Sequence, residues 1–109
     1  MRSRLFDFGR FSEPALLILI SLADGPKHGY AVMEDVARTA GVRLGTGTLY
    51  GALARLERHG LVAPAGADER RRPYRLTDAG AAALRAHLGE LRDLATAGLR
   101  RLEAVEAAS

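Results

Sequence analysis

Residues 45–77 place a short amphipathic helix directly before a small hairpin. The helix is predicted to open with the sequence GTLY at residues 47–50 and to end at Gly60, because glycine commonly follows the last turn of a helix. Four apolar side chains recur at helical spacing and predict a buried face: Leu49, Ala52, Leu53 and Leu56. The opposite face is small near the helix start and carries Arg55 and Arg58 further along. The segment therefore predicts a helix that packs on one side and is free on the other.

The free side of this helix suits the major groove of a DNA duplex. Small side chains let the helix start sink between the phosphate ridges, and arginines further along meet the backbone or a guanine edge. Thr48 and Tyr50 flank this side and are candidates for contacts with phosphates or base edges, while Arg55 and Arg58 are candidates for backbone or guanine. The alternatives are an ordinary solvated surface helix and, for Tyr50, a half-buried ring.

Two short apolar runs after the helix predict the strands of a hairpin at residues 61–64 and 73–76, joined by a loop over residues 65–72. Because a two-stranded ribbon is marginal by itself in water, it is expected to lean on the helices and to leave its tip projecting. Four arginines of the loop and second strand are candidates for contacts with phosphates or the minor groove: Arg70, Arg71, Arg72 and Arg75. The alternative is a solvated charge run that Asp68 and Glu69 partly neutralise.

An almost uniformly apolar helix is predicted near the start of the chain. It begins close to Ser12, a good N-cap residue, and ends at the sequence DGP of residues 24–26. Since a short helix with so little polar surface must be buried on most sides, a second subunit is expected to cover it, with Leu16 and Leu19 among the contacts. Its apolar run is far shorter than the roughly 20 residues of a membrane-spanning helix.

A second helix is predicted over residues 28–40 and is ended by Gly41. Lys27 and Tyr30 lie at its front, where a helix that crosses a duplex meets the sugar-phosphate backbone. Both are candidates for DNA contacts, and for Tyr30 packing in the core is the favoured alternative.

The last predicted helix covers residues 78–107 and is capped by Thr77. Apolar and small residues recur along it in alternating steps of four and three, as in a coiled coil: Leu84, Leu88, Leu91, Ala95, Gly98, Leu102 and Val105. The helix would extend roughly 45 Å, beyond the roughly 34 Å width of a compact chain of this length. Its leucines and Val105 are therefore predicted to contact a second subunit, with a helix folded back at Gly89 or Gly98 as the alternative.

The expected fold is mainly α with a small two-stranded antiparallel hairpin. It comprises a winged helix-turn-helix domain over residues 12–77 and a C-terminal dimerisation helix over residues 78–109. Residues 1–11 form an N-terminal arm whose three phenylalanines are expected to pack onto the body or a partner subunit. These phenylalanines are Phe6, Phe8 and Phe11.

Several kinds of chemistry lack their usual residues. Cysteine is absent, and His28, His59 and His87 lie in separate elements without ligand spacing, so no metal site and no cofactor are predicted. Paired carboxylates, a phosphate-binding glycine loop and a nucleophile motif are also missing, which argues against an enzyme. The net charge of +3 favours a nucleic-acid partner, and the lack of cysteine and of a recognisable signal peptide predicts a cytoplasmic location.

Four short motifs and one glycine occur in a fixed order within residues 12–82: GPKHGY at 25–30, GTLY at 47–50, GLV at 60–62, YRLT at 74–77, and Gly80. Together they resemble the PadR family of bacterial transcriptional regulators, in its short type with a single C-terminal dimerisation helix. The resemblance implies a dimer that represses transcription and leaves the DNA when a small-molecule effector binds. The working hypothesis is a homodimer that places the two helices at residues 47–60 in successive major grooves of a roughly palindromic double-stranded operator. The chain departs from the usual pattern at Gly45-Thr46, where the family commonly has Ser-Pro, and at Gly51, where it commonly has proline.

Two other functions stay open at this point. The same fold serves in some proteins as a protein-interaction module that never contacts nucleic acid, because fold alone does not fix function. A ligand-gated sensor is the second, with a cavity for an apolar or aromatic effector between the first helix and the long helix. The basic wing beside an uncharged helix start favours DNA binding over both.

Overall fold

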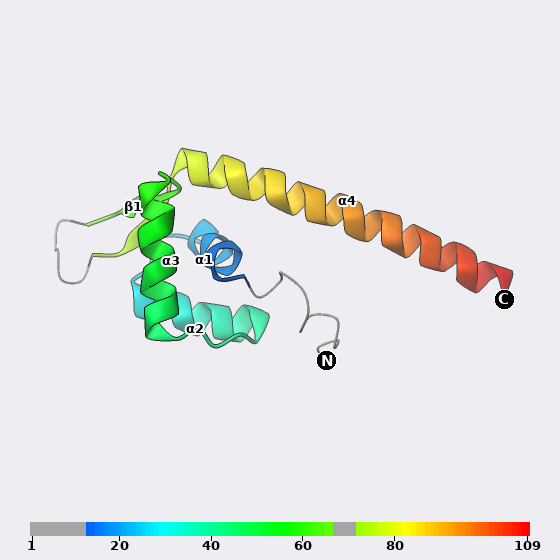
Figure 1. The fold of residues 1–109 in the computed structure, drawn as a ribbon, viewed down its shortest axis with the longest axis horizontal. Helices are drawn as coiled ribbons and strands as arrows, with labels where there is room; N and C mark the ends of the chain where they lie inside the picture. Colours follow the sequence, from blue (N-terminus) through cyan, green and yellow to red (C-terminus); the bar gives the residue numbers. More distant parts are fainter. Residues whose placement is uncertain (1–12, 67–71) are drawn as a thin grey trace.

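The computed structural model describes residues 13–66 and 72–109, and it confirms the predicted fold class (Figure 1). Four helices and one two-stranded antiparallel sheet follow one another along the chain. They are α1 (Pro14–Ala23), α2 (Gly29–Ala40), α3 (Thr46–Arg58), β1 (Val62–Pro64), β2 (Tyr74–Leu76) and α4 (Asp78–Ala108). The predicted N-terminal arm and the middle of the hairpin loop lie outside the described residues.

Helix α1 is the centre of the fold and contacts α2, α3, α4 and β2. Its N-cap is Glu13, one residue later than predicted, and Pro14 occupies the first turn, where its missing N–H costs nothing. The expectation that a partner must bury this helix is wrong, because its own chain leaves Leu16 only 8% and Leu19 only 7% exposed. Ile20, at 39% exposed, is the large apolar side chain of α1 that remains at the surface.

One apolar core joins all the elements. Its fully buried side chains come from α1, α2, α3 and β1: Ile18, Leu22, Val32, Val36, Leu49, Leu53 and Val62. The four residues predicted for the buried face of α3 are all buried. Burial of aliphatic side chains contributes about 1.5–3 kcal/mol each, so this shared core fixes how α3 sits on α1 and α2.

Helix α3 begins at Thr46, one residue before the predicted start, and has Gly45 as its N-cap. It runs without interruption through Gly51, so the glycine that departs from the family pattern does not break the helix. It ends at Arg58, two residues before Gly60, where the sequence predicted its end. Gly60 has φ +75°, the left-handed conformation that glycine adopts after a helix.

The hairpin is anchored to the body at its base. In the ladder, Val62 pairs with Leu76 and Pro64 with Tyr74. Tyr74 also bridges to Lys27 in the turn before α2: the Lys27 N–H donates to the Tyr74 carbonyl at 3.0 Å, and the Tyr74 N–H donates to the Lys27 carbonyl at 2.9 Å. This bridge, which the sequence did not predict, gives the short ribbon the support that a ribbon of its size requires.

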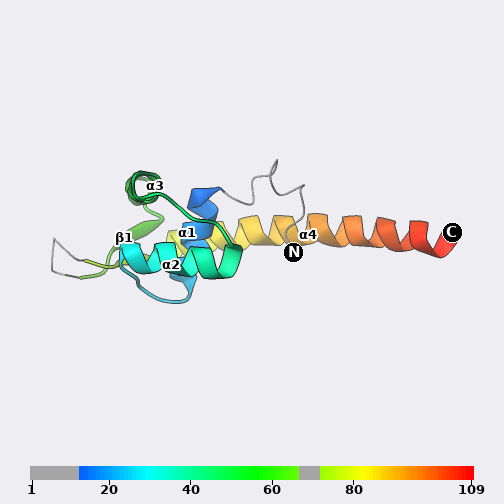
Figure 2. The same cartoon turned by 90° about the horizontal axis from the view of Figure 1, so that it is seen from below.

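Helix α4 starts beside the described strands and leaves the body as one long rod, so its C-terminal end lies at the opposite end of the molecule from them (Figures 1 and 2). Its first turn is capped as predicted, since the Thr77 hydroxyl accepts the Gly80 N–H at 3.0 Å. The helix is continuous through Gly89 and Gly98, so the folded-back alternative is wrong. The chain is consequently elongated, with principal extents of 61 × 26 × 19 Å and a radius of gyration of 16.4 Å, against about 13 Å for a compact chain of similar length.

Candidate nucleic-acid interface

The outward face of α3 is open. Gly47, Gly51 and Ala54 are exposed along it, and Arg58 is exposed at its end. A Cβ atom added at Gly47 or Gly51 would meet nothing within 4 Å. These glycines therefore have no packing role within the described chain. They leave the α3 backbone accessible to a partner such as DNA, whose major groove is deep enough to admit a helix.

The candidate residues of α3 lie on different sides of this open face. Arg55 lines a small surface pocket of about 200 Å³ together with Glu13 and His59, so it lies on the flank of α3 near the start of α1. Thr48 is exposed at the helix start. Tyr50 lies on the side that meets α2, and its ring is 46% exposed.

Tyr50 packs directly on the first residue of α2. A Cβ atom added at Gly29 would lie only 2.5 Å from the Tyr50 hydroxyl oxygen and 2.7 Å from Cζ. Tyr50 therefore packs on α2 with one part of its ring but is exposed overall, and its exposed part is available to a partner. Gly29 itself is buried, so the lack of a side chain there lets α3 approach the start of α2.

We predict that Gly29→Ala displaces the Tyr50 ring and lowers the free energy of unfolding by about 1–2 kcal/mol, a typical cost of overpacking. Urea denaturation measures this loss. In a Tyr50→Ala background the same change is expected to cost nothing, because the atoms that it meets are gone. Gly47→Ala is the matched control, and stabilises the protein by up to about 1 kcal/mol through helix propensity. An equal cost of Gly29→Ala in both backgrounds contradicts the packing role of Tyr50.

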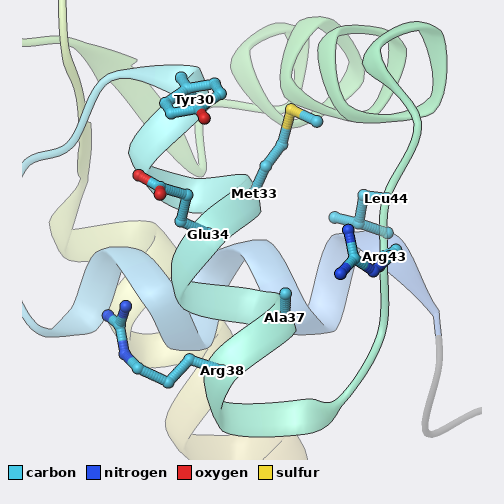
Figure 3. A pocket seen from close by; sticks show the side chains of 7 residues that line it. All are labelled: Tyr30, Met33, Glu34, Ala37, Arg38, Arg43 and Leu44. Atoms are coloured by element: carbon cyan, nitrogen blue, oxygen red, sulfur yellow. The ribbon is translucent and has the colours of Figure 1, made fainter.

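Tyr30 is 68% exposed, so the expectation that it packs in the core is wrong. The buried stripe of α2 follows Val32 and Val36, and at 100° per residue Tyr30 lies about 120–160° around the helix from these valines. Its ring borders a broad, open pocket of about 500 Å³ between α2 and the segment that leads to α3 (Figure 3). The pocket is also lined by Met33, Glu34, Ala37, Arg38, Arg43 and Leu44. Tyr30 is thus free to contact a partner at the front of α2.

Lys27, in contrast, is turned into the protein. Its side chain is 16% exposed; the ammonium donates to the Ser21 carbonyl near the end of α1 and lies 3.6 Å from a carboxylate oxygen of Asp24. A cation at the C-terminal end of a helix is stabilised by the carbonyl groups there. Lys27 therefore has a structural role, and we do not keep it as a contact to DNA.

Arg43 is a basic residue that the sequence analysis overlooked. It is exposed on the segment between α2 and α3, and Figure 3 shows its guanidinium on the far side of the pocket from Tyr30. Within the described ranges, no carboxylate pairs with Arg43, Arg55 or Arg58. The signal that could have identified Arg43 is its place in the turn of the predicted helix-turn-helix, two residues after Gly41.

The hairpin presents its basic residues outward. Arg75 is exposed between the half-buried Tyr74 and Leu76, as the alternation of side chains along a strand requires. Arg72 is half-buried where the chain returns from the loop. Arg70 and Arg71, with Asp68 and Glu69, lie outside the described residues. Of the four candidate arginines of the wing, Arg72 and Arg75 therefore lie within the described residues.

Helix α4 carries an apolar stripe beyond the body. Of the predicted contacts, Leu88, Leu102 and Val105 are 39%, 59% and 65% exposed, and Leu91 is half-buried. Leu84 is 6% exposed and belongs to the core, so its assignment to a partner contact is wrong, as it is for Leu16 and Leu19. The prediction also missed two leucines at the edges of the stripe, Leu94 and Leu99, which are 71% and 60% exposed. We call this surface the outer seam: Leu88, Leu91, Leu94, Ala95, Gly98, Leu99, Leu102 and Val105.

The acidic and histidine side chains of residues 13–66 and 72–109 are spread apart. In these ranges no three side chains of His, Asp or Glu are grouped so that they would hold a metal ion. None of the helices there combines the length and the apolar character needed to cross a membrane.

Together, an exposed helix preceded by a short turn and followed by a basic hairpin define a winged helix-turn-helix protein. Residues 18–86 match the model of the Transcriptional regulator PadR-like family. The chain therefore belongs to the PadR-like family of transcriptional regulators.

Known structures share this architecture. A PadR family regulator from hypervirulent Clostridium difficile R20291 is 26% identical, with a TM-score of 0.71 over 86% of this chain and 99% of that one. A PadR family regulator from Eggerthella lenta DSM 2243 is 29% identical, with a TM-score of 0.71 over 91% of this chain and 88% of that one. RosR of H. salinarum is 28% identical, with a TM-score of 0.65 over 72% of each chain.

A curated relative is much longer than this chain. It is an uncharacterised 37.1 kDa protein in transposon Tn4556 of Streptomyces fradiae, 51% identical over 71 residues. The match covers 65% of this chain and only 21% of that relative. The likeness therefore concerns one part of that protein.

Proposed function

We propose that this protein is a homodimeric repressor that reads a roughly palindromic operator with two copies of α3. The observation that carries the proposal is the open face of α3, whose start is uncharged. It lies between Arg43 and Arg58, which have no ion-pair partner among residues 13–66 and 72–109, and a basic wing follows it. Each subunit inserts α3 into one major groove, and the two half-sites lie about one helical turn, or roughly 34 Å, apart. The location that fits this role is the cytoplasm.

Within each half-site the residues have distinct tasks. Thr48 and the exposed part of Tyr50 contact phosphates or base edges at the start of α3, and Arg55 and Arg58 contact the backbone or a guanine edge. Arg43 joins Tyr30 as a contact to the sugar-phosphate backbone in front of α2. The wing arginines hold the backbone on the other side of α3.

The outer seam supports the dimer. Its leucines would leave a long apolar stripe in water in a lone subunit, and large exposed apolar patches commonly mark protein interfaces. The stripe follows the coiled-coil spacing that lets two helices pack side by side. We propose that it pairs with the seam of a second copy, with Ile20 of α1 at the edge of the contact.

Selection from random duplexes tests this function. The full chain is expected to enrich sequences that contain two inverted half-sites, and to shift such a duplex at moderate salt in a gel. A duplex of the same composition in scrambled order is the control. Enrichment of no sequence at all contradicts the proposal and favours a winged-helix module that docks on protein.

We predict that replacing Arg70, Arg71 and Arg72 by alanine lowers the salt dependence of DNA binding, because each phosphate contact contributes about 0.9 to the slope of log K against log salt. The substitution removes three contacts from each subunit of the proposed dimer, so it reduces the slope by about 5 and weakens binding to every sequence alike. Titrations of the DNA with the protein at several salt concentrations, from low to moderate, measure this slope. The control replaces three exposed arginines of α4: Arg85, Arg92 and Arg100. A slope that stays unchanged in the wing variant rules out the wing contact.

Release by an effector is the remaining part of the proposal. Neither of the two pockets described above lies between α1 and α4, where the sequence analysis expected an apolar cavity. The pairing of two outer seams would enclose apolar surface next to α1, and we propose this region for a small apolar or aromatic effector. The test is a screen of aromatic acids and aldehydes for compounds that dissociate the selected duplex.

A further inference from the structure

The end of α3 and the start of α4 meet at one compact junction. The Gly60 N–H donates to the Glu57 carbonyl at 3.0 Å, and the Leu61 N–H donates to the Leu56 carbonyl at 2.9 Å. With Gly60 at φ +75°, these bonds form the Schellman ending of a helix, in which glycine takes the left-handed conformation. The chain therefore leaves α3 in one fixed direction.

Thr77 joins that exit to α4 with both its backbone and its side chain. Its N–H donates to the Leu61 carbonyl at 3.1 Å. Its hydroxyl donates to the Gly60 carbonyl at 2.6 Å and accepts the Gly80 N–H at 3.0 Å. One hydroxyl group thus holds the C-terminal end of α3 and the N-terminal end of α4 at the same time.

Gly80 lets two backbone segments approach closely at this junction. It is buried, and a Cβ atom added to it would lie 2.0 Å from the Leu61 carbonyl oxygen and 2.9 Å from Leu76 Cδ1. The first turn of α4 therefore touches the backbone that leaves α3, with no side chain between them. A contact between backbones cannot adjust by a change of rotamer, so the angle between the two helices is firmly held.

We propose that Thr77 and Gly80 are positioning residues that set the spacing between the two DNA half-sites. The inference rests on the proposed function, in which α3 reads DNA and the outer seam joins two subunits. Ala95, in the middle of the seam, lies roughly 26 Å along α4 from Asp78. A tilt of about 10° at the junction moves that point by roughly 5 Å, which exceeds the 3.4 Å rise of about one base pair. A loose junction would therefore let the dimer accept several spacings.

The test measures affinity against spacing for variants of the full chain at Thr77. Thr77→Val keeps the shape of the side chain and removes the hydroxyl, whereas Thr77→Ser keeps the hydroxyl and is the control. Thr77→Asp still caps α4 but has no proton to donate to Gly60 at neutral pH, so it tests the proposal even if the valine variant does not fold. The selected operator is prepared with its half-sites moved apart or together by one and two base pairs, together with a duplex that holds a single half-site.

The wild type and Thr77→Ser are expected to prefer one spacing and to lose at least about tenfold in affinity when it changes, because mismatched geometry prevents both subunits from engaging. In Thr77→Val and Thr77→Asp that difference falls below about threefold, while affinity for the single half-site stays within about twofold. If Thr77 only stabilised the fold, its substitution would lower the affinity for all duplexes equally. If the wild type shows a sharp optimum and both variants keep it, the inference is wrong and the proposed function stands. If the wild type selects no sequence, both fail.

Discussion

Replacing Leu102 by glutamate is expected to separate the proposed dimer into folded monomers and to lower operator affinity by at least about 100-fold, the usual loss when two linked binding events become independent. Leu102 is 59% exposed in the single chain, so the charge does not disturb the core. In the paired seam, however, a carboxylate would be buried without a partner. Sedimentation equilibrium gives the mass, circular dichroism confirms the helix content, and a gel shift gives the affinity.

Ala104→Glu is the matched control, because Ala104 lies about 200° around α4 from Leu102 and faces away from the seam. It adds the same charge to the same helix and should leave the mass of the dimer and its affinity unchanged. Should Leu102→Glu still sediment as a dimer and bind the operator normally, the outer seam is not the dimer interface.

Gly80→Ala is expected to lower the free energy of unfolding by about 3 kcal/mol. This value lies at the upper end of the cost of overpacking. The added methyl group would lie 2.0 Å from the Leu61 carbonyl oxygen, so backbone must move to make room. For a domain of this size the loss corresponds to a fall of roughly 15 °C in melting temperature. Thermal denaturation followed by circular dichroism measures it.

Gly89→Ala is the control on the same helix. Its added Cβ would meet only the guanidinium of Arg92, at an ordinary 3.8 Å, and alanine favours a helix over glycine by about 1 kcal/mol. This variant should melt at a higher temperature than the wild type. Equal melting temperatures for the two variants would show that the junction has room that the structure does not indicate.

Local patterns in the sequence were enough to predict the order of elements and the buried face of α3. Leu49 and Leu53 recur at helical spacing, Gly60 stops the helix, and Thr77 is followed by a turn that it caps. Each of these signals is local, because it depends on residues within one or two helical turns. For the same reason the element bounds differ from the prediction by only a residue at most ends.

The errors concern contacts between elements that are distant in the sequence. Whether Leu16 is buried by its own chain or by a partner depends on where α4 and β2 pack, and the apolar pattern of α1 is the same in both cases. Lys27 resembles a free cation in the sequence, but the bridge between its backbone and Tyr74 and the nearby end of α1 hold its ammonium inside. Tyr30 is exposed, although packing in the core was the favoured alternative for it, because the buried stripe of α2 follows Val32 and Val36, about 120–160° away around the helix.

The anchoring of the hairpin to Lys27 links the wing to the turn before α2. Because Tyr74 is hydrogen-bonded to the turn before α2, substitutions near that turn alter the base of the wing as well. The bridge lies at the base of the hairpin and is made by the backbone groups of Lys27 and Tyr74. In the proposed function, a change in this turn would therefore alter the contacts of the wing as well as those of α2.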